Sequence, residues 1–464
     1  MTTFDFNHAD ALTQAIEQRF DQTLQRLGEL VAIPSVAWES HDLSQVQRSA
    51  EKVRDLALAA GFENAALYTA DYTAENGETK TGMPAVLASR PAAEGYPTIL
   101  LYAHHDVQPA GDEALWDTPP FETVRKGDRL YGRGAADDKA GVLLHLAAIE
   151  AVSSVLGDDF KLGIKLFIEG EEEAGSPSFE SFVNTYRDQL NADYIVVADS
   201  SNWRAGVPAL TTSLRGVASG VIEARVGSHA LHSGVFGGPL LDAHTVLARL
   251  IATLHDEQGS VAIEGLSRRD DQDIVYAESD FRADSGALEQ MSLAGTGSIA
   301  SRLWTQPAVS VIGWDIPSVA NSSNTLAAVS RAIISVRLAP GTDPQAAHAA
   351  IEAHLNQHAP LNAQITYTPQ DSGQPFDIDV DSYGARLALA AFEKAWGVQP
   401  VKAGMGGSIP FIATLKQVFP QAQILVTGIE DPDTRAHSAN ESLYVPDLLH
   451  GIVAEALVLA ELSK

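Results

Sequence analysis

The stretch TILLYAHHD (98–106) begins with an apolar run that predicts a β-strand at 98–102, and two histidines and an aspartate follow this strand almost at once. Two further apolar runs also end in polar residues, LGIKLFIEGEEE (162–173) and YIVVADS (194–200). Helices are predicted between them at 140–156 and 177–190, the second from a Ser-Pro pair that suits a helix start. Strands and helices that alternate at this length indicate an α/β sheet with helices on both faces.

The flanking segments continue this pattern, and one segment interrupts it. Helices are predicted at 9–31, 43–60, 383–396 and 445–462, and strands at 66–69, 84–89 and 423–427. Between them, strands are predicted at 217–226, 332–338 and 363–368, with helices at 240–254 and 344–358. This β-α-β-α-β content is typical of a split-βαβ domain. The sequence therefore predicts an α/β domain with a mixed sheet (1–212 and 374–464), interrupted by a smaller ferredoxin-like α+β domain (213–373).

The composition excludes several classes of function. The chain has 464 residues, with 60 Asp or Glu against 31 Lys or Arg, a formal net charge of -29. Nucleic acids and anionic membranes need a basic face, so neither is expected as a partner. Cysteine is absent, so a metal site would use His and carboxylate ligands. No apolar run approaches the ~20 residues of a membrane span and no secretory signal is found, so a cytoplasmic location is expected.

Two polar clusters combine glycine or histidine with aspartate. His104 and Asp106 point the same way in an extended chain, so the carboxylate can orient the imidazole; a solvated strand end is the alternative. Asp137 and Asp138 follow the segment GRGAA and suit a metal bridge or, alternatively, a helix N-cap. A dinucleotide-binding loop is not indicated there, because the third glycine is missing.

Three more clusters supply carboxylates and a histidine. The run EGEEE (169–173) follows its strand without a spacer, which weakens the alternative of a solvated acidic face. Crowded carboxylates repel one another unless a cation lies among them. Asp199 ends a strand, where it could also be a turn cap, and His437 lies in a loop, where an exposed histidine is the alternative.

Together the clusters supply His104, Asp137, Glu173, Asp199 and His437. Two histidines and three carboxylates suit two divalent cations that share one bridging carboxylate. Two-metal hydrolases hold their ions ~3.5–4 Å apart and use a bridging water as the nucleophile. A neighbouring carboxylate that is not a ligand would take the proton from that water.

These motifs and their order resemble the superfamily of zinc aminoacylases, carboxypeptidase G and carnosinase-type dipeptidases (peptidase family M20, clan MH). The family pattern H-x-D occurs at 104–106, G-R-G-x-x-D-D-K at 132–139, and E-G-x-E-E-x-G-S at 169–176. The resemblance spans nearly the whole chain. Jointly the motifs are highly specific.

The resemblance implies a role for each ligand. His104 and Asp199 would bind one ion, Glu173 and His437 the other, and Asp137 would bridge the two.

It also implies roles for the neighbours of these ligands. Asp106 would orient His104. Glu172 would be the general base, and then the acid that protonates the leaving amine. The peptide between Asp137 and Asp138 is typically cis in this family.

The inserted segment extends the resemblance to substrate binding. LHSG (231–234) resembles the D-L-H-S-G motif of the dipeptidase branch, in which His232 would reach a partner subunit's site and polarise the scissile carbonyl. Asn324 lies at the N-x-x-P position, and Arg337 matches the arginine that clamps the substrate carboxylate. GGSIP (406–410) would contact the same carboxylate through Gly407 and Ser408. Three positions depart from the family pattern: Ala140, Ala230 and Ala327.

The sequence therefore predicts a dinuclear metal-dependent hydrolase of amide bonds. We expect a dipeptidase that acts on small peptides with a free C-terminal carboxylate, holds two divalent ions (zinc, with manganese or cobalt as alternatives) and forms a homodimer through the inserted lid and dimerisation domain. An N-acyl-amino-acid deacylase or desuccinylase is the alternative within the superfamily. A non-catalytic metal- or ligand-binding protein is the alternative outside it. A serine hydrolase built on Ser408 is disfavoured because no G-x-S-x-G elbow is present.

Overall fold

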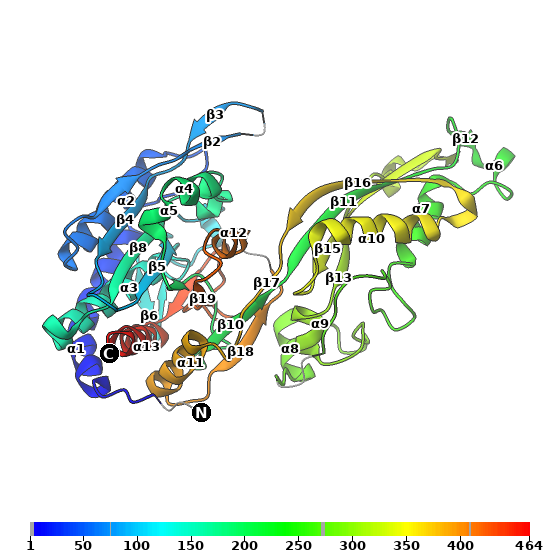
Figure 1. The fold of residues 1–464 in the computed structure, drawn as a ribbon. Helices are drawn as coiled ribbons and strands as arrows, with labels where there is room; N and C mark the ends of the chain where they lie inside the picture. The colour runs from blue at the N-terminus through cyan, green and yellow to red at the C-terminus, as the bar shows by residue number, and fades with distance from the viewer. Residues whose placement is uncertain (1–3, 75, 271–273, 408–409) are drawn as a thin grey trace. The chain divides into compact units, whose positions relative to one another are not determined.

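The computed structural model describes residues 4–74, 76–270, 274–407 and 410–464. The chain forms two compact units (Figure 1). Unit 1 comprises Met1–Thr212, Ile378–Ala403 and Thr414–Lys464, and unit 2 comprises Ser213–Asp377 and Gly404–Ala413.

Unit 1 is built on a mixed β-sheet. Its helices are α1 (Ala9–Val31), α2 (Ser44–Ala59), α3 (Lys139–Leu156), α4 (Phe179–Thr185), α5 (Arg187–Leu190), α11 (Tyr383–Trp396) and α13 (Val445–Leu462). Its main strands are β1 (Ala66–Tyr68), β4 (Ala85–Arg90), β5 (Thr98–His104), β8 (Gly163–Glu169), β9 (Tyr194–Val197) and β19 (Gln423–Val426). Four elements lie where the chain passes between the units: β10 (Ala209–Leu214), β17 (Phe376–Asp377), β18 (Val401–Met405) and α12 (Pro410–Val418).

The direction of the central strands creates one polar edge. The sheet has the order β1-β4-β8-β5-β9-β19-β10-β17, with β18 beside β10. Strands β8, β5, β9 and β19 are parallel, whereas the outer pairs are antiparallel. The carboxyl ends of β5, β8 and β9 therefore meet at one edge, where open α/β sheets bind ligands.

Alternation along β5 places its side chains on the two faces of the sheet. Ile99 and Leu101 are fully buried in a core shared with α1, α2, α3, α11 and α13. Tyr102 lies on the opposite face, where its ring contacts Phe167 with the centroids 5.3 Å apart. Phe182 of α4 stacks on Phe167 at 5.0 Å. Both faces of the strand are thus buried, which explains its continuous apolar sequence.

Helix α3 is a long apolar helix in the core beside the sheet. Among the residues that the structure describes, it alone has the length and hydropathy of a membrane span. Most of its side chains are buried, and it packs against α1, α13 and β5. Its hydrophobicity is therefore that of a core helix.

One predicted helix of unit 1 is wrong in its extent. The segment 177–190 forms two short helices, α4 and α5, that meet at Tyr186. The Tyr186 hydroxyl donates to the Thr69 carbonyl at 2.8 Å, and its ring contacts that of Tyr68 with the centroids 5.1 Å apart. These are tertiary contacts, which a local pattern does not contain. The sequence analysis also did not predict two small sheets. One pairs β2 (Asp71–Thr73) with β3 (Thr79–Thr81), and the other has the order β20 (Ser442–Tyr444), β7 (Arg129–Tyr131), β6 (Val124–Lys126).

Unit 2 has its own antiparallel sheet. Its main elements are β11 (Gly216–Arg225), α7 (Ala243–Ala252), β13 (Ala308–Trp314), β15 (Val329–Leu338), α10 (Pro344–Gln357) and β16 (Gln364–Gly373). The strand order is β13-β15-β11-β16, and α7 and α10 pack against the sheet around a core that includes Ile222, Leu250, Ile334 and Ile351. This βαββαβ order is a split-βαβ arrangement. Shorter elements are β12 (Leu231–His232), α6 (Ser233–Phe236), α8 (Glu278–Ser285), α9 (Ile299–Trp304) and β14 (Thr325–Leu326).

Strand β13 was missed by the sequence analysis. It is an edge strand with a bulge between Val311 and Gly313, and the side chains in its middle are exposed. A strand with apolar residues on its solvent side and a glycine inside it lacks the alternation by which half-buried strands are recognised.

Candidate active site

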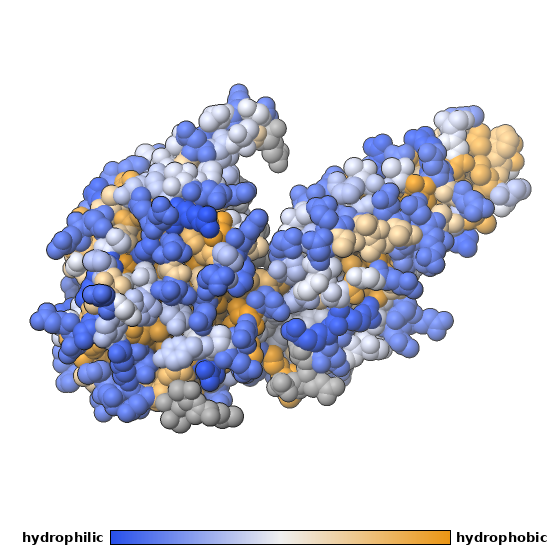
Figure 2. Space-filling view, in the orientation of Figure 1, coloured by the Kyte–Doolittle hydropathy of each residue, from blue (hydrophilic) through white to orange (hydrophobic). Residues whose placement is uncertain are grey.

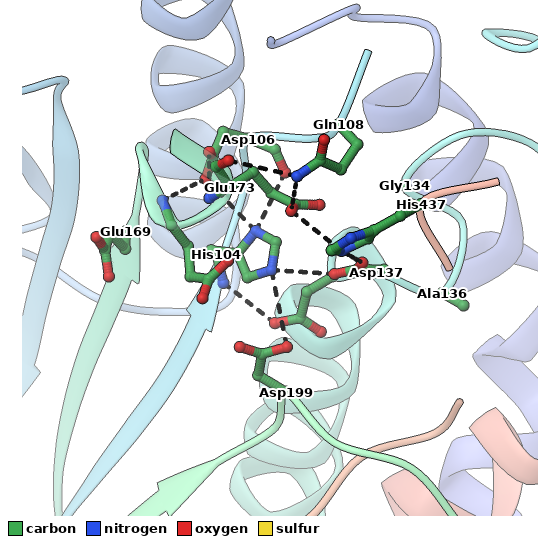
Figure 3. A network of polar contacts seen from close by, with 12 residues as sticks. His104, Asp106, Gln108, Gly134, Ala136, Asp137, Glu169, Glu173, Asp199 and His437 are labelled. Atoms are coloured by element: carbon green, nitrogen blue, oxygen red, sulfur yellow. Dashed lines mark hydrogen bonds and ion pairs between the residues drawn. The ribbon is translucent and has the colours of Figure 1, made fainter. Parts of the chain in front are cut away.

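Polar residues from five segments converge in unit 1 (Figure 3). His104 is the last residue of β5, Glu173 lies in a 3-10 turn that follows β8, and Asp199 comes two residues after β9. Asp137 precedes α3 and His437 comes from a C-terminal loop, in which its φ of +60° is left-handed. A non-glycine residue in this conformation is uncommon and often belongs to a functional site.

Asp137 lies between the two histidines. Its Oδ1 is 3.2 Å from His104 Nε2, and its Oδ2 is 3.1 Å from His437 Nε2. Asp199 Oδ1 is 3.8 Å from the same His104 nitrogen, and Glu173 Oε2 is 3.2 Å from the same His437 nitrogen. One carboxylate therefore faces two His–carboxylate pairs, one through each of its oxygens.

The donor atoms of this cluster fit divalent cations. His104 Nε2 and Glu173 Oε1 are buried and have no hydrogen-bond partner among the described residues. Ligand atoms of His104, Asp137 and Glu173 lie within 4.8 Å of one another, as do those of His104, Asp138 and Asp199. Buried polar atoms are almost always satisfied, so these orphaned nitrogen and oxygen atoms point to cations as the missing partners.

The electrostatics of the cluster also call for positive charge. Burial and the Asp199 charge raise the pKa of Glu172 to about 9, and burial raises the pKa of Asp199 to about 7. Hydrogen bonds to Asp137 and Glu173 raise the pKa of His437 to about 11. Without metal, protons therefore neutralise the crowded carboxylates, and cations would take over that role.

Asp106 holds the strand ends together beneath this cluster. Its Oδ1 and Oδ2 accept hydrogen bonds from the backbone N–H groups of Glu172 and Glu173, at 3.1 and 3.0 Å. Its Oδ1 is also 3.4 Å from His104 Nδ1, and its carbonyl oxygen is 3.1 Å from that nitrogen. Asp106 is thus placed to fix the orientation of His104, and Nε2 is left to face Asp137 and Asp199.

Two more residues contact the cluster. The sequence analysis did not single out Gln108, and it considered Asp138 only together with Asp137, as a metal bridge or a helix N-cap. Gln108 donates from Nε2 to Glu173 Oε2 at 2.7 Å. Asp138 Oδ2 accepts from the His104 backbone N–H at 3.1 Å, and the peptide between Asp137 and Asp138 is cis. Gln108 lies two residues after Asp106, so the alternation that pairs Asp106 with His104 is a signal that could have found it.

Glu441 is a third residue that the sequence analysis missed. It is fully buried, and its Oε1 accepts from the backbone N–H groups of Ala136 and Asp137 at 3.0 and 3.2 Å. Its Oε2 accepts from Gly134 N–H at 3.0 Å and from Arg133 Nη1 at 2.6 Å. Glu441 therefore anchors the loop that carries Asp137. Its position four residues after His437 is the only sequence signal for it.

The remaining predicted residues lie in unit 2, in two separate places. His232 is exposed and pairs with Thr325 between β12 and β14, and Ser233 N–H donates to the Asn324 carbonyl at 2.9 Å. His232 and Asn324 are therefore neighbours.

Arg337 lies at the other end of the sheet. It is half-buried in β15, where it pairs with Val217 of β11. Positions 329 to 337 of β15 separate the two places by about 26 Å of extended strand. Gly407 borders open space, and Ser408 lies outside the described residues.

Residues 100–461 match the Peptidase family M20/M25/M40. The chain belongs to this family. A cysteinylglycine-S-conjugate dipeptidase of Corynebacterium striatum is 33% identical over 374 residues, which cover 79% of this chain and 82% of that protein. The Cys-Gly metallodipeptidase dug1 of Schizosaccharomyces pombe is 28% identical over 98% of both chains. The predicted family and enzyme class, a metallopeptidase of the dipeptidase type, are confirmed.

A solved structure supports the same fold for this M20-family peptidase. Human carnosine dipeptidase 1 superposes with a TM-score of 0.75 at 24% sequence identity, over 98% of this chain and 99% of that chain. The prediction of a mixed α/β fold is thereby confirmed.

Proposed function

We propose that this M20-family peptidase hydrolyses dipeptides and other small peptides with a free C-terminal carboxylate at a dinuclear metal centre. The observation that carries the proposal is the position of Asp137, whose two oxygens face His104 and His437 separately. The names of the relatives, which are Cys-Gly and β-Ala-His dipeptidases, support a dipeptide substrate.

Two divalent ions suit this set of donors. His104 and Asp199 would hold one ion, Glu173 and His437 the other, and Asp137 both. Zinc fits two imidazoles with three carboxylates, and manganese or cobalt are the alternatives. When bound, such ions polarise the scissile carbonyl and lower the pKa of an attacking water.

Glu172 would move the proton. Its backbone N–H is held by Asp106, and it precedes Glu173 in the same 3-10 turn. The carboxylate would accept a proton from the attacking water and return it to the nitrogen of the leaving amine, which balances the hydrolysis. Asp106 would act through His104 and through this turn, as a positioning residue.

Arg337 would bind the substrate carboxylate as a bidentate fork, with Gly407 and Ser408 contributing from the glycine-rich loop. His232 would stabilise the oxyanion that forms on the scissile carbonyl, with Asn324 beside it. Because β15 holds Arg337 about 26 Å from the His232 end of the same sheet, the two residues of one chain would not reach the same dipeptide.

We therefore propose that unit 2 is a lid and dimerisation domain and that His232 serves the site of a second copy of this chain. Exposed apolar residues support this proposal: Val235 and Phe236 directly after His232, and Val311, Ile312 and Val319 at or after the edge strand β13. Figure 2 shows hydrophobic residues gathered at the end of unit 2 where β12 and α6 lie. Such patches and unpaired strand edges are typical of interfaces.

Metal analysis of the purified protein, combined with a substrate panel, tests the function. We expect about two divalent ions per chain and hydrolysis of Cys-Gly or β-Ala-His. Faster hydrolysis of N-acetyl- or N-succinyl-amino acids would favour the deacylase or desuccinylase alternative. A metal-loaded protein inert to the whole panel would favour the non-catalytic alternative. The cytoplasmic location stays a prediction, which cell fractionation would test.

A further inference from the structure

Arg215, which directly precedes β11, is a buried arginine with no acidic partner among the described residues. The residue is only 9% exposed, and its Nε donates to the Gly406 carbonyl at 3.1 Å. Within the described part of the chain, its two Nη atoms make no hydrogen bond or ion pair. Buried arginines are almost always paired with carboxylates, so this guanidinium lacks its expected counter-ion.

A second arginine lies beside it. Val217 pairs with Arg337 across β11 and β15, and Arg215 comes two positions before Val217, immediately before the start of β11. Burial, together with the positive charge of Arg337, lowers the pKa of Arg215 to about 10. Arg337 also makes no ion pair in the portion of the chain that the structure covers. Two guanidinium groups therefore share one region of unit 2 without an anion.

The backbone at Gly406 lies close to Arg215. A Cβ atom at Gly406 would lie 2.9 Å from Arg215 Nη2, which is too close for an ordinary contact, and a Cβ atom at Gly407 would meet nothing within 4 Å. Glycine at 406 thus lets the backbone approach the guanidinium, while Gly407 borders open space. The region has two cations, close backbone and room, which together suit a small anion.

We propose that Arg215 is a second substrate-binding residue, which shares the C-terminal carboxylate of the substrate with Arg337. This inference rests on the proposed function and extends it. One carboxylate oxygen would accept from each guanidinium, and the substrate would supply the counter-ion that the described residues do not provide. The site would then reject peptides whose C-terminus is blocked, because both arginines would be left unpaired.

Kinetics with Cys-Gly and its C-terminal amide test the proposal. We expect Arg215→Met to raise KM for Cys-Gly about tenfold to hundredfold, the loss typical of a charge-assisted hydrogen bond, with a smaller change in kcat. Hydrolysis of the amide should change little, so the acid-to-amide ratio of kcat/KM should fall about tenfold to hundredfold. Arg331→Met is the matched control, because Arg331 lies on β15 with Arg337 but is exposed and paired with Glu223. It should leave the ratio unchanged.

Two further variants keep the proposal testable if Arg215→Met does not fold. Arg215→Lys keeps a charge and should restore part of the ratio, whereas Gly406→Ala should displace the guanidinium and lower it. Calorimetry with a reduced-bond analogue of Cys-Gly gives a readout that needs no turnover, and Arg215→Met should bind it at least about tenfold more weakly.

The possible failures are distinguishable. An Arg215→Met enzyme that loses acid and amide hydrolysis equally, and binds the analogue normally, would overturn the role of Arg215 and leave the dipeptidase proposal intact. A wild-type protein that hydrolyses no dipeptide would overturn the proposed function. Calorimetry with the analogue would then test by itself whether Arg215 binds the carboxylate: weaker binding by Arg215→Met would support the role, and unchanged binding would overturn it.

Discussion

The carboxylate of Asp106 accepts a hydrogen bond of 3.0 Å from the backbone N–H of Glu173. This bond joins the residues that follow β5 to the turn that follows β8. Asp106 also faces His104 Nδ1, so one buried side chain positions residues from both strand ends. Its role can be separated from that of the ligands themselves.

Asp106→Asn should weaken metal binding and lower kcat/KM about tenfold to hundredfold, the usual cost of losing a group that orients a ligand. The amide leaves only one acceptor for the Glu172 and Glu173 N–H groups. Metal content after dialysis against limited zinc, and kcat/KM with zinc in excess, are the measurements. Asp112→Asn, in the exposed loop that follows, is the control and should behave as wild type. Unchanged metal content and activity in Asp106→Asn would contradict the positioning role.

Glu172→Gln should retain metal and lose hydrolysis by about 10²–10⁴-fold, because the amide cannot accept the proton from water. Metal analysis and steady-state kinetics measure the two effects separately. The exposed Glu180→Gln in α4 serves as a control for the loss of one negative charge. Near-full turnover in Glu172→Gln would mean that another group is the base.

Removal of metal should make stability depend on pH. The raised pKa values of Asp199 (about 7) and Glu172 (about 9) mean that folding favours their protonated forms. Stability is then fully present below about pH 4 for these groups and is lost as the pH rises through about 7 to 9. The Tm of chelator-treated protein should therefore fall between pH 5 and 9.

Zinc should reverse this trend, because it binds the deprotonated ligands and stabilises the folded state by about 2.7 kcal/mol at a hundredfold excess over Kd. Thermal unfolding with and without zinc across this pH range checks the prediction. A metal-free protein whose Tm rises steadily to pH 9 would be inconsistent with it.

A mixture of His232→Ala and Glu172→Gln chains should recover activity that neither homodimer has. A mixed dimer carries one site with both an intact Glu172 and an intact His232 from the other chain, so recovery to at most half of wild-type activity is expected. The chains are refolded or co-expressed together, purified by two different tags and assayed. An active His232→Ala homodimer, or no recovery in the mixed dimer, would count against a shared site.

Glu441→Gln should destabilise unit 1 and loosen the Asp137 loop. It breaks a buried ion pair with Arg133, a change that typically costs ~3–5 kcal/mol in the free energy of unfolding. The free energy of unfolding, measured with denaturant, and the affinity for zinc should both be reduced. Glu278→Gln, which breaks the exposed pair with Arg282 in α8, is the control and should change the unfolding free energy by less than ~0.5 kcal/mol. Equal effects of the two substitutions would show that burial of the pair does not matter.

The sequence was sufficient for the features that repeat locally. The apolar run of β5 and the helix α3 were predicted almost to the residue, because the period of buried side chains is written along the chain. The five candidate ligands were predicted as well: His104, Asp137 and Glu173 belong to short motifs, whereas Asp199 and His437 follow from a strand end, a loop and the resemblance to the family. Their convergence around Asp137 agrees with that prediction, although their roles as ligands stay predictions.

Tertiary structure decided what depends on distant partners. The break at Tyr186, the edge strand β13, the anchoring of the Asp137 loop by Glu441 and the placement of Arg215 beside Arg337 all arise from contacts between segments far apart in the chain. No local period contains such contacts, because strand register and sheet order are set by packing of the whole core. Residue types and their alternation are local properties, whereas the meeting of two charges across a sheet is a property of its topology.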